Sequence, residues 1–296
     1  MSVTSFVEEN RFLSAGRLVA MVWAGKSPIC SLRQVLKSRK MSARISEFKA
    51  SIESTARVIE HDEADQLWRT PFGEYWFPAG AEVSRLANCI AEQQAGIYTP
   101  NEPPMKTGDV ILDCGANIGT FSKKCFQYHP KLVISVEPAP GNLNCLKRNL
   151  ASEARSGRSV IVPTGLWSQE GKLVLSLDPQ NPLRHSVVFD RGAHSEVSIN
   201  VRTIDSIVSE LRLENLHFLK MDIEGAELEA LEGARETIRK FRPTLSIAVE
   251  HGKDLIANAR AVIDLVRGIR ADYTWDCPFC EEMGSKLIFP DVLVFQ

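Results

Sequence analysis

From residue 109 onwards, short apolar runs alternate with segments of helical periodicity, and this alternation limits the possible folds more than any other feature. The apolar runs lie at 110–113, 132–137, 160–162, 217–222 and 245–250. Between two of them, Leu143, Leu146 and Leu150 recur at helical spacing. Near-continuous apolar strands separated by helices form parallel sheets covered on both faces. The pattern therefore predicts an α/β domain with a doubly wound, mostly parallel sheet.

Four further patterns predict smaller elements. Residues 172–177 and 197–201 alternate by twos, which predicts a small antiparallel excursion, and residues 287–296 predict a closing strand pair at the sheet edge. Turn residues at 71–74 separate two aromatic runs, which is typical of a hairpin, and residues 82–96 have helical spacing.

The organisation along the chain follows from these elements. The loop at 100–108, rich in proline, is the best candidate boundary. We expect a basic helical N-terminal extension over 1–65, then a hairpin and helix over 66–108, and the main domain over 109–296.

Composition is that of a globular protein, with 44% hydrophobic and 24% charged residues. It argues against wholesale disorder, a collagen-like repeat and a polytopic membrane protein. Seven cysteines without a paired framework indicate reduced thiols, so we expect a cytoplasmic protein. A structural zinc needs four ligands, and no second pair accompanies Cys277-Pro-Phe-Cys280. We interpret Cys277 and Cys280 as two reduced cysteines in a loop.

Charge is concentrated at the N-terminus. Residues 1–50 hold nine lysines and arginines against three glutamates, although the whole chain has a net charge of −2. The overall charge gives no reason to expect nucleic acid as a partner. For the basic segment two interpretations stay open: a solvated helical extension, or an amphipathic segment in peripheral contact with anionic lipid or a polyanionic substrate.

Four of the five predicted strands end in a carboxylate. These residues are Asp113, Glu137, Asp222 and Glu250. Ligands of open parallel sheets bind outside the carboxyl ends of the strands, and uncompensated charge is not expected in a packed core. The four carboxylates are therefore expected to face one functional crevice.

The segment from Asp113 to Ser122 follows a strand and opens a helix. Gly115 allows close approach to a ligand, and Gly119 relieves contact where the helix meets the strand. Asn117 stands where the dinucleotide fingerprint requires its second glycine, which disfavours a pyrophosphate. Glu137, 24 residues after Asp113, suits a carboxylate that accepts both ribose hydroxyls. A nucleoside with a charged amino-acid tail near Asp113 describes S-adenosylmethionine.

Three segments carry a resemblance to a known family. They are Val110–Gly119, Val136–Leu143 and Phe218–Glu227, and together with Arg202–Ser206 and Leu231–Ala234 they resemble the FkbM-type family of S-adenosylmethionine-dependent methyltransferases. The resemblance covers about residues 70–255. It implies a seven-stranded Rossmann-like sheet, a bound S-adenosylmethionine, and methyl transfer to a hydroxyl, often of a sugar or polyketide.

The resemblance also implies roles for single residues. Asp113, Gly115, Asn117 and Gly119 would surround the methionine part of the cofactor. The ribose would lie on Glu137 and the adenine beside Pro138, with Leu166 and Trp167 lining its pocket; a core position is the alternative for Trp167. Tyr98 is expected to close over the cofactor.

Catalysis is expected at the end of the fourth strand, where acidic oxygens suit removal of a proton from an alcohol. Asp222 is our first candidate for the general base or for orienting the hydroxyl, and Glu224 is the second. Glu227 is interpreted as favourable charge in the first helical turn. His251 is a further candidate base. Asp222, Glu250 and His251 could instead hold a divalent cation, but we predict no resident metal.

The sequence leaves the acceptor, the oligomeric state and two other functions open. We expect a small-molecule or glycan acceptor with a free hydroxyl, and a loop at 178–187 is a candidate lid carrying Arg184, His185 and Ser186. A nucleotide-sugar or NAD-using enzyme and a catalytically silent binding protein are the alternatives.

Overall fold

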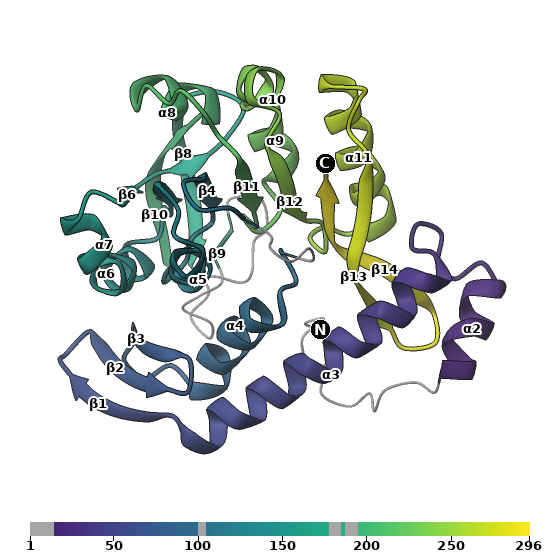
Figure 1. The fold of residues 1–296 in the computed structure, drawn as a ribbon, viewed down its shortest axis with the longest axis horizontal. Helices are drawn as coiled ribbons and strands as arrows, with labels where there is room; N and C mark the ends of the chain where they lie inside the picture. The colour runs from purple at the N-terminus through teal and green to yellow at the C-terminus, as the bar shows by residue number, and fades with distance from the viewer. Residues whose placement is uncertain (1–14, 100–104, 178–184, 187–194) are drawn as a thin grey trace.

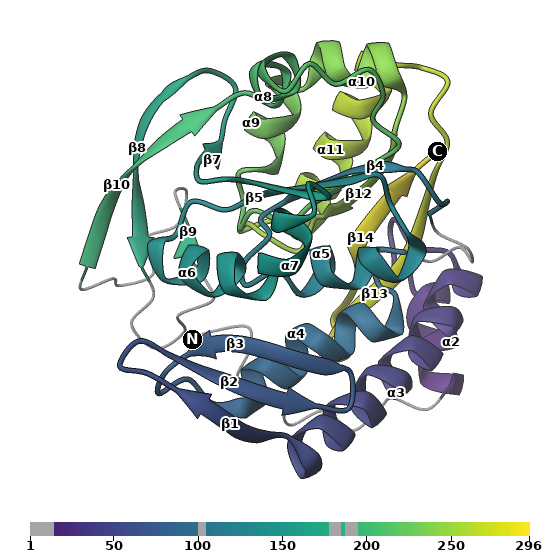
Figure 2. The same cartoon turned by 60° about the vertical axis from the view of Figure 1, so that its left-hand side comes forward.

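A computed structural model describes residues 15–99, 105–177, 185–186 and 195–296. Its centre is a seven-stranded sheet with helices on both faces (Figures 1 and 2). In spatial order the strands are β13 (Trp275–Met283), β14 (Leu287–Phe295), β12 (Thr244–Ala248), β11 (Phe218–Met221), β4 (Val110–Cys114), β5 (Leu132–Val136) and β6 (Ser159–Val162). The predicted doubly wound sheet is confirmed.

Five of these strands are parallel and coincide with the five apolar runs of the sequence. Strand β14 pairs antiparallel with β12 on one side and with β13 on the other, so the closing strand pair is confirmed and β13 forms the edge. The interpretation of Cys277–Cys280 as a loop is wrong, because these residues lie in β13. Pro278 is accommodated there because the register shifts between Asp276 and Phe279.

Two layers of helices cover the sheet, and alternate residues of each strand face one or the other. Leu112 and Cys114 of β4 belong to the core on the α8–α11 side, whereas Ile111 packs with residues of α4 and α5. The helices of the domain are α5 (Thr120–Cys125), the 3₁₀ turn η1 (Phe126–Tyr128), α6 (Pro140–Asn149), α7 (Ala151–Arg155), α8 (Ile204–Glu210), α9 (Glu227–Glu232), α10 (Arg235–Phe241) and α11 (Leu255–Ile269).

A second sheet lies beside β6. It contains β7 (Gly165–Leu166), β10 (Ser195–Arg202), β8 (Gly171–Leu177) and β9 (His185–Ser186). Strands β8 and β10 pair antiparallel, which confirms the predicted excursion. The predicted lid lies outside the described residues except for the backbone of the two-residue strand β9.

The N-terminal part packs against the sheet domain. Its elements are α2 (Ala15–Trp23), α3 (Leu32–Thr55), β1 (Arg57–His61), β2 (Asp65–Thr70), β3 (Gly73–Pro78) and α4 (Val83–Ala95). The hairpin β2–β3 and helix α4 are where the sequence predicts them, whereas β1 is a strand at the end of the segment expected to be helical. Ser31 and Gln34 form a capping box that starts α3.

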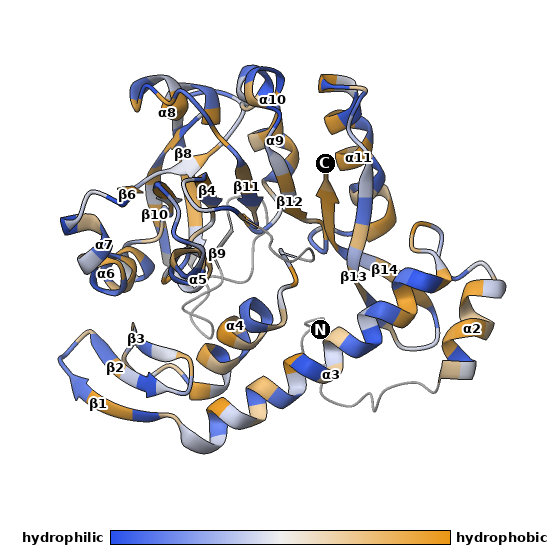
Figure 3. Ribbon diagram, viewed as in Figure 1, coloured by the Kyte–Doolittle hydropathy of each residue, from blue (hydrophilic) through white to orange (hydrophobic). Residues whose placement is uncertain are grey.

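Helix α3 carries alternating polar and apolar positions and contacts both α4 and β13 (Figure 3). Val35, Met41 and Ile52 are buried in three different core clusters. The long helix therefore connects the hairpin at one end of the molecule with the sheet edge at the other. Among the described helices, none combines the length and apolarity that crossing a bilayer requires.

Candidate active site

The main pocket opens at the carboxyl ends of β4, β5 and β11, and encloses roughly 950 Å³ of space that includes open solvent. This is the edge where ligands of open parallel sheets bind. Of the residues named from the sequence, those that line it are Gly115, Asn117, Glu137, Pro138, Leu166, Asp222 and Glu224. Helix α4 adds Glu92 to one wall. The sequence did not predict this wall, because the polar residues of α4 follow the same pattern as those of a helix with one face in solvent.

The turn after β4 depends on glycine for a reason internal to the protein. Gly115 has φ +77°, and a Cβ at this position would overlap the main-chain carbonyl of Asp222. The sequence predicted close approach to a ligand. The structure shows close approach to the loop that follows β11, and Gly115 also lines the pocket. Similarly, a Cβ on Gly119, at φ +90°, would lie 2.7 Å from Leu146 Cδ1 of α6 rather than against a strand.

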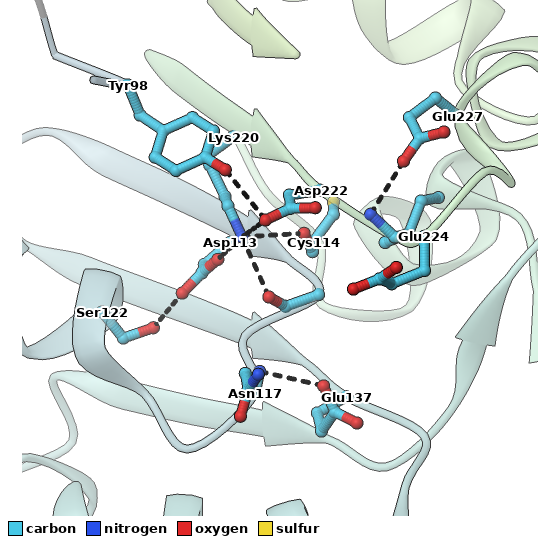
Figure 4. Close-up of polar contacts among 12 residues, drawn as sticks. Tyr98, Asp113, Cys114, Asn117, Ser122, Glu137, Lys220, Asp222, Glu224 and Glu227 are labelled. Atoms are coloured by element: carbon cyan, nitrogen blue, oxygen red, sulfur yellow. Dashed lines mark hydrogen bonds and ion pairs between the residues drawn. The ribbon is translucent and has the colours of Figure 1, made fainter. Parts of the chain in front are cut away.

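Glu137 is held at the end of β5 by backbone amides. Its Oε2 accepts from Asn117 N (Figure 4) and its Oε1 from Ala139 N, both at 2.9 Å. Asn117 reaches this position with φ 54°, a left-handed conformation that asparagine tolerates. Burial raises the pKa of Glu137 to about 7, although these amides and the Asn142 side chain oppose the rise. Each carboxylate oxygen retains acceptor capacity toward the pocket.

Lys220 is the residue that sequence reasoning missed. It lies in the middle of β11, directly opposite Asp113 of β4, and its Nζ is 3.4 Å from Asp113 Oδ1. The same Nζ donates to Gly115 O at 2.9 Å and lies 3.9 Å from Asp222 Oδ2. Burial alone would lower the pKa of Lys220, but the carboxylates of Asp113 and Asp222 raise it. A lysine inside an apolar strand was the signal in the sequence, because buried lysines require a partner.

Asp113 therefore faces the protein and does not line the pocket. Its side chain is completely buried, and its Oδ2 accepts from Ser122 Oγ of α5 at 2.6 Å (Figure 4). Of the four strand-end carboxylates, Glu137 and Asp222 line the pocket. Glu250 instead lies near Glu281 and Asp291 in a separate acidic group.

Asp222 carries a partly exposed carboxylate held from three sides. Its Oδ2 accepts from Tyr98 OH at 2.8 Å, its Oδ1 lies 3.2 Å from His251 Nε2, and Lys220 is nearby. Burial alone would raise the pKa of Asp222, but the charge of Lys220 and the hydrogen bonds hold this pKa well below its usual range. Tyr98 is buried and contacts Asp222 instead of lining the pocket.

His251 is buried behind Asp222. Desolvation opposes protonation, but the carboxylates of Glu227, Asp222 and Glu224 raise the pKa of His251 to about 10. The imidazole therefore already carries a proton at neutral pH. Neither His251 nor Trp167 lines the pocket; Trp167 packs on the small sheet against Leu175 and Ile199.

Comparison with known proteins identifies the family. The sequence profile described as the methyltransferase FkbM domain matches residues 113–273, which is more than half of the chain. The chain belongs to the FkbM family of methyltransferases.

Curated relatives are 30–32% identical to this chain over 43–46% of its length. Methyltransferase sdnD of Sordaria araneosa is 32% identical over 43% of this chain and 60% of that protein. The 2-O-methyltransferase NoeI of Sinorhizobium fredii is 30% identical over 46% of this chain and 62% of that protein, and the hexuronic acid methyltransferase AglP of Haloferax volcanii is 30% identical over 44% and 52%. The chain thus spans about 50–60% of the length of these relatives.

A solved structure of methyltransferase FkbM from Methylobacillus flagellatus superimposes with a TM-score of 0.49 at 18% identity, covering 87% of this chain and 59% of the other. The order and directions of the strands, rather than this superposition, establish the fold.

In this FkbM-family chain, the loop after β11 is closed by an acidic side chain. Glu227 Oε1 accepts from Ile223 N at 2.9 Å and from Gly225 N at 3.3 Å (Figure 4). Asp222, Glu227 and His251 offer three ligand atoms within 4.8 Å of one another, so Glu227 takes the place expected for Glu250 in a metal-binding group. Because Glu227 is buried and bonded to the loop amides, its main role is to shape the loop that carries Glu224.

We predict that Gly115→Ala destabilises the protein far more than Gly108→Ala, its matched control. Gly108 also has positive φ, +89°, but a Cβ there meets nothing within 4 Å. We expect Gly108→Ala to cost about 1 kcal/mol for the left-handed backbone, and Gly115→Ala about 3 kcal/mol or more because the Asp222 loop must also move. Urea unfolding of both variants measures the difference. Equal losses would contradict the close approach of the two loops.

Proposed function

We propose that the protein is an S-adenosylmethionine-dependent methyltransferase that methylates a hydroxyl oxygen of a sugar, a glycan or a small secondary metabolite. Family membership and the names of the relatives NoeI and AglP support this proposal. The observation that carries it is one pocket with Glu137 at the end of β5 and Asp222 with Glu224 at the end of β11.

The nucleoside half of the pocket fits the cofactor. Both oxygens of Glu137 are fixed by amides and can still accept hydrogen bonds, which suits a ribose diol. Asn142 also lines this region, and its Oδ1 is buried without a hydrogen-bond partner among the described residues. A buried orphan acceptor calls for a donor on a ligand. Pro138 and Leu166 provide apolar surface for the base.

The methionine half would lie along the turn after β4. Gly115 and Asn117 line this part of the pocket, whereas Asp113 would act indirectly. By pairing with Lys220, Asp113 fixes the amine that holds the carbonyl of Gly115. In this proposal Asp113 and Gly119 are positioning residues that keep the turn in place.

When bound, S-adenosylmethionine supplies an electrophilic methyl group on a positively charged sulfur. The residues of the chain would hold the acceptor hydroxyl in line with that methyl, and such positioning provides most of the rate. Asp222 is the group placed to accept the hydroxyl hydrogen bond. Its low pKa makes it a weak base, but the hydroxyl becomes far more acidic as its oxygen is methylated. A permanently ionised carboxylate therefore suffices to take the proton.

His251 would serve Asp222 rather than act as the base. A protonated imidazole cannot accept the proton of the acceptor, but it can hold the Asp222 carboxylate in one orientation together with Tyr98. Glu224 lines the same end of the pocket and stays the second candidate for proton acceptance.

We predict that the protein binds S-adenosylmethionine, with an affinity that rises with pH through the titration of Glu137. A protonated carboxyl is a poorer acceptor of ribose hydroxyls, so binding favours the ionised form. With a pKa of about 7, one-proton linkage gives about tenfold tighter binding at about pH 8 than at about pH 6. Calorimetry at both pH values measures this.

Glu137→Gln is the matched control, because it keeps the shape of the side chain but removes the titration. We expect this variant to bind S-adenosylmethionine more weakly, with an affinity that no longer rises between about pH 6 and about pH 8 through titration at position 137. Preferential binding of NAD⁺ by the unaltered protein would instead support the nucleotide-using alternative and refute the proposed cofactor.

We predict that Asp222→Asn lowers kcat by about 100-fold or more, the usual range for an acid–base group, and leaves the affinity for S-adenosylmethionine nearly unchanged. The measurement is formation of demethylated cofactor in the presence of a hydroxylated acceptor, found by screening for the mass of an added methyl group. Glu224→Gln is the comparison and should cost less. Equal losses of turnover and cofactor affinity in Asp222→Asn would contradict the assigned role.

A further inference from the structure

Three buried cysteines from distant parts of the chain meet at one point away from the pocket. Cys30 lies just before the start of α3, and Cys277 and Cys280 lie in β13. The Sγ atoms of Cys30 and Cys277 are 3.3 Å apart, and those of Cys277 and Cys280 are 3.0 Å apart. All three sulfurs lie within 4.8 Å of one another. We call this group the thiol cluster.

The backbone of β13 is adapted to bring its two thiols together. Residues three apart in a regular strand point to opposite faces of the sheet. In β13 the pairing with β14 shifts between Asp276 and Phe279, and again between Phe279 and Cys280. These irregularities place both thiols beside Cys30. Bulges of this kind re-aim side chains and are features of the fold rather than defects.

The surrounding residues fix the cluster from both segments. Ser38 Oγ of α3 donates to Gln34 O at 2.9 Å and accepts from Cys280 N at 2.8 Å. The Asp276 carboxylate accepts from Cys277 N at 2.9 Å and also from the Gln34 side chain of α3. The helix and the strand are thus joined around the sulfurs by hydrogen bonds from each side.

We propose that the thiol cluster binds a thiophilic divalent cation, zinc in the first instance. Three thiolates supply three of the four ligands of tetrahedral zinc, and a water molecule would complete the coordination. A zinc ion with bonds of about 2.3 Å separates its sulfurs by about 3.8 Å, so each thiol would need to move by only a few tenths of an ångström. A second Cys-x-x-Cys pair is not needed, because Cys30 supplies the third ligand through the fold.

A small hollow adjoins the cluster at Cys280 and would admit a water molecule as the fourth ligand; its wall includes Ser38, Arg39 and Glu282. Binding converts three thiols to thiolates and releases three protons, which leaves a net charge of −1 on the zinc group. The wall of this hollow carries Arg39, which has the opposite charge, together with the acidic Glu282.

The position of the site indicates its effect. It connects the loop before α3 to the edge strand of the central sheet, and α3 in turn packs against α4, which lines the pocket. A metal ion at the thiol cluster would therefore stabilise the docking of the N-terminal helices, and through α4 one wall of the pocket. The proposal does not depend on methyl transfer.

The test is the metal content of the full chain, expressed with added zinc, freed of any metal-binding tag and desalted. We expect about one zinc ion per chain by elemental and native mass spectrometry, and a lower melting temperature after chelation. Replacement by Co²⁺ should give the intense sulfur-to-cobalt charge-transfer bands of tetrahedral thiolate coordination. This spectrum reports the ligands in the unaltered protein, even where cysteine variants fail to fold.

The variants Cys30→Ala and Cys277→Ala should each lose the zinc, whereas Cys125→Ala, which removes a buried cysteine outside the cluster, should keep it. A metal-free protein with three alkylatable thiols would overturn the proposal. A disulfide between two of the three cysteines, or full zinc content in both cluster variants, would overturn it as well.

Discussion

The ion pair between Asp113 and Lys220 at the centre of the sheet is the interaction on which the site depends. The two residues stand opposite each other on β4 and β11, and Ser135 and Ser246 extend the same register onto the neighbouring strands. A buried charge without its partner is strongly destabilising, so the pair fixes how β4 and β11 align. From this position Lys220 also holds the Gly115 carbonyl and faces Asp222. The turn after β4 and the loop after β11 therefore both contact the amine of Lys220.

The electrostatics of the pocket follow from this arrangement. Its walls carry the carboxylates of Glu92, Glu137, Asp222 and Glu224, and the protonated His251 lies behind Asp222. The buried cations Lys220 and His251 hold the pKa of Asp222 well below its usual range. Burial raises the pKa of Glu137 to about 7, because the hydrogen bonds to Glu137 and the charge of Lys220 offset the effect of burial only in part. The two carboxylates thus have different pKa values. In the proposed function, this difference suits Glu137 for binding a ribose and keeps Asp222 ionised, so that it can accept a hydrogen bond from the acceptor hydroxyl.

The sequence predicted the sheet well because its strands are buried on both faces and therefore appear as uninterrupted apolar runs. The placement of Glu137 and Asp222 in one pocket also followed, since parallel strands end at the same edge. The contacts of Asp113 and Gly115 could not be predicted from the sequence, because they depend on which strands are neighbours. Strand β4 lies beside β11, which is more than 100 residues away along the chain. The same limit applies to Cys277 and Cys280. Tertiary packing brings Cys30 beside them and produces the bulges in their strand, and neither can be read from the sequence.

A crystal structure with S-adenosylhomocysteine, the demethylated product, would show directly how the cofactor lies in the pocket. We expect the ribose hydroxyls on the carboxylate of Glu137 and the sulfur directed toward Asp222, with Lys220 still joined to Asp113. A nucleoside bound outside the pocket, or a sulfur turned away from Asp222, would contradict this expectation.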